Sequence, residues 1–344
     1  MRKIFNTAGP VKEIHYQIDP LTRWNMQDIL ELIAYQKYFI LHAPRQTGKT
    51  SSLLALQKCL NAGDDYVSVY VNLECGQAAR NDVARGIAAI LSEMGGRFET
   101  VPGFESEVSA ILRECLDKTP AENGLNRFLK LVCRKLDKPL VLLIDEIDSL
   151  VGDTLISVLR QLRAGYDTRP DDFPQSVILC GVVDIKDYKI HRSDNEIIKG
   201  GSCFNIKSKS LRLGNFNKEE IFSLYTEHTK ETGQTFSDGV FDLAWEYTAG
   251  QPWLVNALAF EACFEMEENR DRSIPITSAI FEEAKERLIL SRATHLDQLA
   301  DKLKEERVRR VIEPMLTGGD SRGTDADNQY CLDLGLIRNY ERRY

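Results

Sequence analysis

Short apolar runs alternate with longer amphipathic stretches over the first two thirds of the chain. The apolar or β-branched runs, each of strand length, lie at residues 38–41, 66–73, 140–144, 176–183 and 209–213. Patterns with helical spacing separate them at residues 51–60, 77–95, 107–136 and about 154–164. Strands that alternate with helices predict an α/β domain, a doubly wound parallel sheet, over residues 1–216.

Beyond that domain the pattern is helical only. Asn217, with Glu220 three residues later, can form a capping box. The helices predicted from there lie at residues 218–232, 237–248, 252–268, 277–290, 297–316 and 325–334. We therefore expect a separate helical bundle over residues 217–293 and a third segment over residues 294–344. A long polar loop over residues 186–204 is also predicted.

Residues 1–37 form an N-terminal segment before the first strand. Within it, Asn25 can cap a helix. Its predicted apolar face comprises Ile29, Leu30, Ile33 and Ala34.

Residues 43–50, which read APRQTGKT, connect the first strand to the first helix of the sheet. A strand–loop–helix setting of this kind indicates phosphate binding, because backbone N–H groups and a helix N-terminus both attract anions. Lys49 would reach the β- and γ-phosphates, and the Thr50 hydroxyl would ligate Mg²⁺. Ala43 replaces the first glycine of the usual pattern, and its methyl is small enough for that turn. The predicted nucleotide contacts here are Ala43, Pro44, Arg45, Gln46, Thr47, Gly48, Lys49, Thr50 and Ser51.

Two adjacent acids, Asp145 and Glu146, follow the apolar run at residues 140–144. Asp145 would hold Mg²⁺ through water opposite Thr50, and Glu146 would act as general base on the attacking water. Ligands of open α/β sheets bind at the carboxyl ends of strands, where both motifs fall. The catalytic candidates are thus Glu146 and Lys49. The structural alternatives are a solvated strand end or helix cap for the acids, and an ordinary exposed lysine.

Other polar residues near these motifs have simpler interpretations. Asp148 either orients the region or caps the following helix, and we favour the cap. Arg160 and Arg163 could reach a neighbouring subunit's site, but a solvated helix face is favoured. No Asn-Lys-x-Asp motif for guanine is present, which favours ATP. Adenine contacts would come from residues 5–16 and the helical bundle.

Composition narrows the class of protein. The net charge is −8, so an overall basic nucleic-acid footprint is absent. Eight cysteines occur without C-x-x-C spacing, which argues against zinc and predicts buried free thiols in a reducing cytosol. No apolar run reaches 18 residues and the N-terminus lacks a signal-like apolar region, so we predict a cytoplasmic protein without membrane contact.

These motifs resemble those of AAA+-like and STAND-like P-loop ATPases. The resemblance also rests on residues 211–220 and on Gly250-Gln251-Pro252, and it is strongest to a bacterial group of AAA-like ATPases of unassigned role. It implies an ATPase sheet, a helical lid and a winged-helix-like C-terminal module that ends inside or just past its wing. It also implies that the Pro252 turn packs against the nucleotide. Members often continue into a PD-(D/E)xK nuclease-like domain, which this chain lacks.

Two features qualify that resemblance. ATPases of this kind often place a polar sensor at the end of the strand after the acids, whereas Val182 and Val183 stand there and Asp184 is the first polar residue. The sensor is therefore shifted or absent. STAND-like proteins often hydrolyse slowly, whereas the acidic pair is suited to hydrolysis.

The sequence thus supports an ATPase that uses Mg²⁺ and whose turnover drives a conformational cycle. The alternative is a nucleotide-gated switch or binding module with little turnover, and a small-molecule kinase is a weaker third interpretation. Three arginines, Arg307, Arg309 and Arg310, share one predicted helix, and Arg338, Arg342 and Arg343 lie near the expected wing. Acids are about as frequent there, so a packing or protein-contact role is favoured over DNA binding. The expected ligands are ATP and ADP. Whether the protein also binds a protein partner or forms a homo-oligomer is not determined by the sequence.

Overall fold

The computed structural model describes residues 3–182, 190–191, 197–198, 208–291, 301–319 and 322–337. The chain divides into two compact units. The sheet unit comprises Trp24–Ala43 and Ser52–Arg212, and the helical unit comprises Met1–Arg23, Pro44–Ser51 and Leu213–Tyr344. Each unit is described by itself below.

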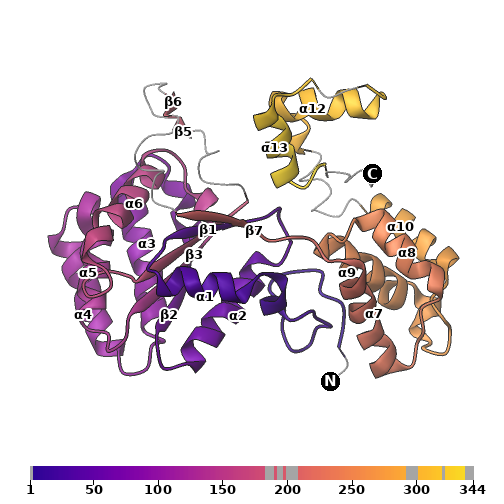
Figure 1. Ribbon diagram of the computed structural model, residues 1–344, viewed down its shortest axis with the longest axis horizontal. Coiled ribbons are helices and arrows are strands. Elements are labelled where there is room, and N and C mark those ends of the chain that lie inside the picture. The colour runs from indigo at the N-terminus through magenta and orange to yellow at the C-terminus, as the bar shows by residue number, and fades with distance from the viewer. Residues whose placement is uncertain are drawn as a thin grey trace. The chain divides into compact units, whose positions relative to one another are not determined.

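A five-stranded parallel sheet forms the centre of the sheet unit (Figure 1). Its strands are β1 Phe39–His42, β2 Val67–Asn72, β3 Leu140–Asp145, β4 Ser176–Gly181 and β7 Lys209–Arg212. Their order is β2-β3-β4-β1-β7, and every neighbouring pair is parallel. All six residues of β3 and of β4 are buried, as expected for strands covered on both faces. The predicted doubly wound parallel sheet is confirmed.

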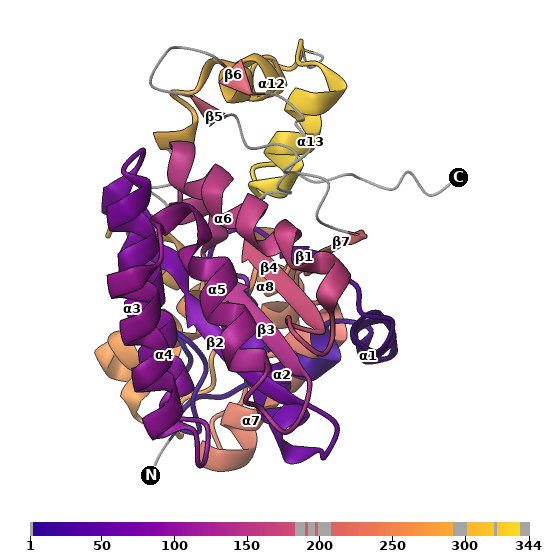
Figure 2. The same cartoon turned by 90° about the vertical axis from the view of Figure 1, so that its left-hand side faces the viewer.

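Helices cover both faces of this sheet. The helices α3 Val83–Phe98, α4 Glu105–Lys118, α5 Ala121–Cys133 and α6 Gly152–Ala164 form a layer on one face (Figure 2). Their apolar side chains share a core with Val71, Ile144 and Leu179 from the strands. On the other face lie α1 Met26–Ala34 and α2 Lys49–Ala62 (Figures 1 and 2).

Three helix predictions in the sheet unit need correction. The helix predicted over residues 77–95 begins later, because a 3-10 helix, Leu73–Ala79, precedes α3. The helical pattern over residues 107–136 corresponds to two helices, because Pro120 lacks an N–H to continue α4 and instead is the N-cap of α5. Asn25 does cap α1 by accepting from the N–H groups of Gln27 and Asp28. Of the predicted apolar face of α1, Ile29 and Ile33 are buried, but Leu30 is 42% exposed and Ala34 is exposed as well.

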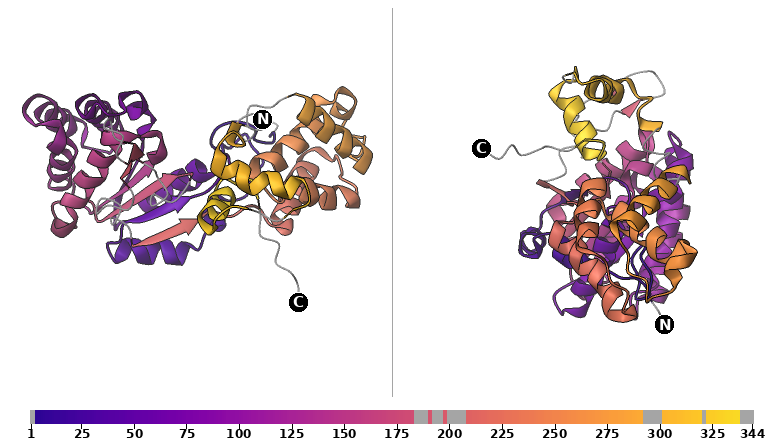
Figure 3. Two further views of the ribbon diagram at one scale, coloured as in Figure 1. Left: turned by 90° about the horizontal axis from the view of Figure 1, so that it is seen from above. Right: turned by 90° about the vertical axis from the view of Figure 1, so that its right-hand side faces the viewer.

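Up to residue 291, the helical unit contains α7 Lys218–Thr232, α8 Asp238–Thr248, α9 Pro252–Phe260 and α10 Ser278–Leu290 (Figure 3). The Asn217–Glu220 capping box is present at the start of α7. The helix predicted over residues 252–268 ends early, because a π-helical turn, Glu261–Glu265, follows α9. An aromatic cluster fills this core, and Phe5 and Tyr16 of the N-terminal segment pack into it beside Tyr225.

The C-terminal segment contributes α12 Glu306–Leu316 and α13 Asp325–Asp333. The helix predicted over residues 297–316 is interrupted, since residues 303–305 form a turn, and residues 292–300 lie outside the described part. A capping box between Thr324 and Asp327 starts α13. The expected wing, with Arg338, Arg342 and Arg343, also lies outside the described residues. Of the polar loop predicted over 186–204, only the paired strands β5 Ile190–His191 and β6 Ile197–Ile198 are described.

Candidate functional site

The phosphate loop, residues 43–50, follows β1 and leads directly into α2. Two of its residues have left-handed backbone, Gln46 with φ 59° and Gly48 with φ 92°. Glycine adopts this conformation without steric cost, whereas Gln46 does so against its intrinsic preference. Turns that combine left-handed and right-handed residues form the concave backbone that binds anions. Both left-handed residues lie in the segment that the sequence predicts to bind phosphate.

Hydrogen bonds within the loop hold its lysine in place. The Thr47 hydroxyl donates to the Pro44 carbonyl oxygen at 2.8 Å, and the Lys49 ammonium donates to the same oxygen at 3.0 Å. Lys49 is only 7% exposed and Thr47 is fully buried. Lys49 is therefore not the exposed surface lysine of the structural alternative. A buried ammonium and the N-terminus of a helix both carry positive charge, so together they favour an anionic ligand.

The acidic pair ends strand β3 in the sheet unit. Asp145 is fully buried, and its two carboxylate oxygens accept from the Glu146 N–H at 3.0 Å and from the Tyr70 hydroxyl at 2.9 Å. Glu146 has left-handed backbone, with φ 55° and ψ 40°, and its side chain is half-buried. Such a conformation costs a non-glycine residue on the order of 1–3 kcal/mol and is concentrated at functional sites. Asp145 is thus neither a solvated strand end nor a helix cap.

The loop begins on the same edge of the sheet as the acids. Both β1 and β3 flank β4, and all three strands are parallel, so their carboxyl ends share one edge. The Ala43 N–H donates to the Gly181 carbonyl oxygen at 3.3 Å, which fixes the start of the loop beside the end of β4. Only β4 therefore separates the first residue of the loop from Asp145.

Asp148 does not cap the following helix, contrary to our sequence interpretation. It lies in a short 3-10 turn, Ile147–Ser149, and one of its carboxylate oxygens accepts from the Val182 N–H at 3.3 Å. The N-cap of α6 is Val151, whose side chain cannot accept a hydrogen bond. Asp148 therefore ties the turn after β3 to the end of β4. The predicted sensor positions, Val183 and Asp184, lie outside the described residues.

A family model described as an AAA domain matches residues 33–188 of the chain. This segment of the chain is similar to AAA domains. The matched segment contains the phosphate loop, the acidic pair and four strands of the parallel sheet. This match confirms the resemblance to AAA+-like P-loop ATPases.

Solved structures similar to this chain include three distant ones. Cdc6p from Pyrobaculum aerophilum is 17% identical with a TM-score of 0.47, over 73% of this chain and 62% of that chain. The ORC2 protein of Aeropyrum pernix, solved with ADPNP and ADP, is 14% identical with a TM-score of 0.47, over 97% and 84%. The RuvB Holliday junction branch migration motor of Thermotoga maritima is 13% identical with a TM-score of 0.45, over 92% and 90%. No curated protein matches.

In the helical unit, the turn before α9 touches the phosphate loop. Gln251 caps α9 by accepting from the Leu254 N–H at 2.6 Å, and its side-chain amide donates to the Arg45 carbonyl oxygen at 3.4 Å. Gly250 has φ 74°, and a Cβ there would lie 1.9 Å from the Phe216 carbonyl oxygen, so no larger residue fits. Pro252 occupies the first turn of α9, as predicted. Its contact with a nucleotide stays a prediction.

The N-terminal segment, expected to contact adenine, is anchored next to the loop. The Val11 N–H donates to the Ser51 hydroxyl at 3.0 Å, and the Trp253 indole donates to the Thr7 carbonyl oxygen at 2.9 Å. Phe5 and Tyr16, at the ends of the predicted adenine-contacting stretch, are buried in the aromatic cluster of the helical unit. These two side chains therefore support the fold, and any adenine contact would come from the residues between them.

Arg23 is a residue that the sequence analysis missed. Its guanidinium donates to the Thr47 carbonyl oxygen at 3.2 Å and to the carbonyl oxygen of Gly214, and it lies 4.6 Å from the centre of the Phe216 ring. Burial lowers the pKa of Arg23 to about 10, so it stays protonated at neutral pH. Arg23 thus joins the phosphate loop to the segment that leads into α7. A lone arginine in a polar stretch carries no signal that would have revealed this.

The two side chains predicted to hold Mg²⁺, Asp145 and Thr50, carry a carboxylate and a hydroxyl, and oxygen donors of these kinds suit Mg²⁺. In the described part of the chain, no group of three or more His, Cys, Asp and Glu side chains could hold a metal. Magnesium is usually bound through one or two carboxylates together with substrate phosphates. The residues present therefore fit an ion that arrives with a nucleotide.

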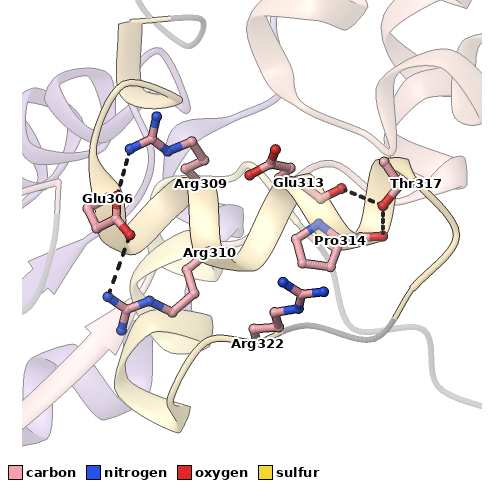
Figure 4. A pocket seen from close by; sticks show the side chains of 7 residues that line it. All are labelled: Glu306, Arg309, Arg310, Glu313, Pro314, Thr317 and Arg322. Atoms are coloured by element: carbon pink, nitrogen blue, oxygen red, sulfur yellow. Dashed lines mark hydrogen bonds and ion pairs between the residues drawn. The ribbon is translucent and has the colours of Figure 1, made fainter.

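Basic residues of the C-terminal segment surround a pocket of about 320 Å³ on α12 (Figure 4). Arg309 pairs with Glu306 at 2.6 Å, and Arg310 lies 3.9 Å from Glu306 and 3.7 Å from Asp327. All three arginines at the pocket, which include Arg322, are exposed. The basic charge on this surface is therefore largely balanced by acids, as the sequence composition indicated.

Other expectations concern the surface and the cysteines. Arg160 and Arg163 lie on exposed positions of α6, as favoured. The seven cysteines in the described residues are free, and five are buried, but Cys59 and Cys75 are exposed, contrary to expectation. Among the described helices, none combines the length and apolarity needed to cross a membrane.

Proposed function

We propose that the protein binds ATP with Mg²⁺ at the carboxyl edge of the sheet and hydrolyses it to ADP and phosphate. The observation that carries this proposal is the acidic pair at the edge where the phosphate loop begins. Asp145 is buried and hydrogen-bonded on both oxygens, while Glu146 has strained backbone and a side chain that water can reach. A purely structural strand end would need neither feature.

Each residue has a distinct role in this proposal. The backbone N–H groups of the loop and the Lys49 ammonium bind the β- and γ-phosphates, and Ser51 lies in the same first turn of α2. Asp145 and the Thr50 hydroxyl hold Mg²⁺, which when bound neutralises negative charge on the phosphates. Glu146 accepts a proton from the water that attacks the γ-phosphorus, and the bond to the β-phosphate oxygen breaks to release ADP.

Turnover would drive a conformational cycle through bonds within the helical unit. Arg23 links the loop at Thr47 to Gly214, and Gln251 links the loop at Arg45 to the start of α9. A loop that changes its backbone between the ATP and ADP states would strain or relax these bonds. We propose that this coupling moves the helices α7 and α9 relative to the loop.

The test is phosphate release by purified protein under multiple-turnover conditions, with ATP and GTP compared and Mg²⁺ either present or removed. Magnesium-dependent release from ATP that Glu146→Gln abolishes supports the proposal. Tight retention of ATP or ADP without turnover would instead favour the nucleotide-gated switch. Gel filtration of both nucleotide states shows whether the protein forms a homo-oligomer.

For the C-terminal segment we propose a packing or protein-contact role. Its exposed Arg309 and Arg310 are paired with acids on the same surface, so a phosphate backbone would have to displace those pairs. Fluorescence anisotropy with duplex DNA at low and moderate salt tests this role. Binding that weakens steeply as salt rises would contradict it.

A further inference from the structure

Strand register places Tyr70 on the same face of the sheet as Asp145. Residues of β2 pair with residues of β3 such that Tyr70 is opposite Leu143 and Asn72 is opposite Asp145. Side chains alternate between the two faces along a strand. Val71 and Ile144 belong to the apolar core under α3 and α5, so Tyr70 and Asp145 both face the opposite side. The two side chains are diagonal neighbours there.

The contact between these side chains is short and buried. The Tyr70 hydroxyl donates to the Asp145 carboxylate at 2.9 Å, Tyr70 is 6% exposed, and Asp145 is fully buried. A phenol hydroxyl is ordinarily protonated at neutral pH, and an ionised carboxylate can only accept, so the hydroxyl is the donor in this contact. The Glu146 N–H binds the other oxygen of the same carboxylate. Two donors on two different oxygens define the plane of the carboxylate.

We propose that Tyr70 is a positioning residue that orients the Asp145 carboxylate toward the magnesium–nucleotide complex. This inference rests on the proposed function, because it concerns the same site. Hydrogen bonds to a metal-binding carboxylate fix its orientation, and their loss typically costs about 10–100-fold in metal affinity or activity. Tyr70 acts on the metal only through Asp145.

A purely structural role for the hydroxyl makes a different prediction. If it merely satisfied a buried carboxylate, its removal would lower stability without changing the response to magnesium. Tyr38 provides a matched control in the same sheet. Its buried hydroxyl donates to the Pro174 carbonyl oxygen at 3.2 Å. Tyr38 immediately precedes β1 and therefore lies at the amino edge of the sheet, opposite the edge with Asp145.

The experiment compares Tyr70→Phe with Tyr38→Phe and wild type. Each variant removes one buried hydroxyl and keeps the ring. Affinity for a fluorescent ATP analogue is measured by anisotropy in EDTA and across a magnesium titration, and a thermal melt verifies folding. For Tyr70→Phe we expect an apparent magnesium dissociation constant raised about 10–100-fold, with affinity in EDTA unchanged. Tyr38→Phe should keep the wild-type magnesium dependence.

A second comparison gives a result that does not depend on how much Tyr70→Phe destabilises the fold. In an Asp145→Asn background, adding Tyr70→Phe should produce no further loss of magnesium dependence, because the hydroxyl acts through the carboxylate. An additional loss of similar size would overturn the inference, and so would equal magnesium dependence in Tyr70→Phe and wild type. If the affinity of the wild-type protein for the ATP analogue is the same with and without magnesium, the proposed function itself is overturned, and the inference with it.

Discussion

The phosphate loop and the surface of α12 both gather basic side chains, yet they are built in opposite ways. In the loop, Lys49 is 7% exposed, donates to a backbone carbonyl and lies beside left-handed backbone at Gly48. On α12, Arg309 and Arg310 are exposed and paired with acids. Burial and strained backbone cost free energy and persist where the surrounding structure imposes them. Exposed ion pairs cost little and contribute little.

Because of this difference, the number of basic residues in a segment is not the reason for proposing an anion site in the loop. The described part of the C-terminal segment contains more arginines than the loop contains lysines, but the guanidinium groups of Arg307, Arg309 and Arg310 are paired with acids. The proposed phosphate binding requires only one ammonium from the loop, because the backbone N–H groups and the start of α2 would supply the remaining positive potential. The predictions below test that contrast from the largest effect to the smallest.

Glu146→Gln tests whether the strained residue at the sheet edge is catalytic. The amide keeps the size of the side chain but cannot accept a proton from water, so kcat should fall by roughly 10²–10⁴. Affinity for ATP should stay unchanged in the anisotropy assay. Losses of equal size in affinity and rate would identify Glu146 as a structural residue.

Lys49→Ala tests the buried ammonium of the loop. A hydrogen bond to a charged group contributes about 1.5–3 kcal/mol, so ATP affinity should fall by about 10–100-fold and hydrolysis with it. Lys37→Ala is the matched control, because Lys37 is exposed and lies just before β1 at the other edge of the sheet. Near-normal ATP hydrolysis by Lys49→Ala would show that the site is assigned incorrectly.

Arg23→Met tests the link between the loop and the segment before α7. Methionine retains apolar contact with Phe216 but leaves the carbonyl oxygens of Thr47 and Gly214 without this donor. We expect a loss of about 1–3 kcal/mol in the free energy of unfolding from urea titration. Stabilisation by ATP should also shrink, since the loop is less ordered. If Arg23→Met has the same free energy of unfolding as wild type, both without and with ATP, the link is refuted.

Arg309→Gln should have the smallest effect. Its partner Glu306 is on the same helix and exposed, and such pairs contribute at most about 1 kcal/mol. Stability and ATP hydrolysis should therefore stay close to wild type in the urea and phosphate-release assays. If the wild-type protein binds DNA in a salt-dependent way and this variant does not, the surface of α12 is an anion-binding region, and the contrast with the phosphate loop is wrong.

Much of the candidate site was predictable because its signals are local. An apolar strand, the Gly48-Lys49-Thr50 stretch and a following helix are contiguous, and Gly48 permits the left-handed turn that the loop requires. Asp145 directly follows an apolar run and is therefore expected at a strand end. The Asn217 capping box and the position of Pro252 are equally local. Pro120 was also a local signal, and the helical pattern predicted over residues 107–136 was not divided there.

The sequence by itself determined the parallel α/β architecture, the phosphate loop and the acidic pair, because each depends on neighbours a few positions away in the chain. Only the tertiary structure decided which residues support them. Tyr70 reaches Asp145 because β2 lies beside β3, and Asp148 reaches Val182 because β4 lies on the other side. Strand order and register arise from packing between distant segments, so no local pattern along the chain encodes them.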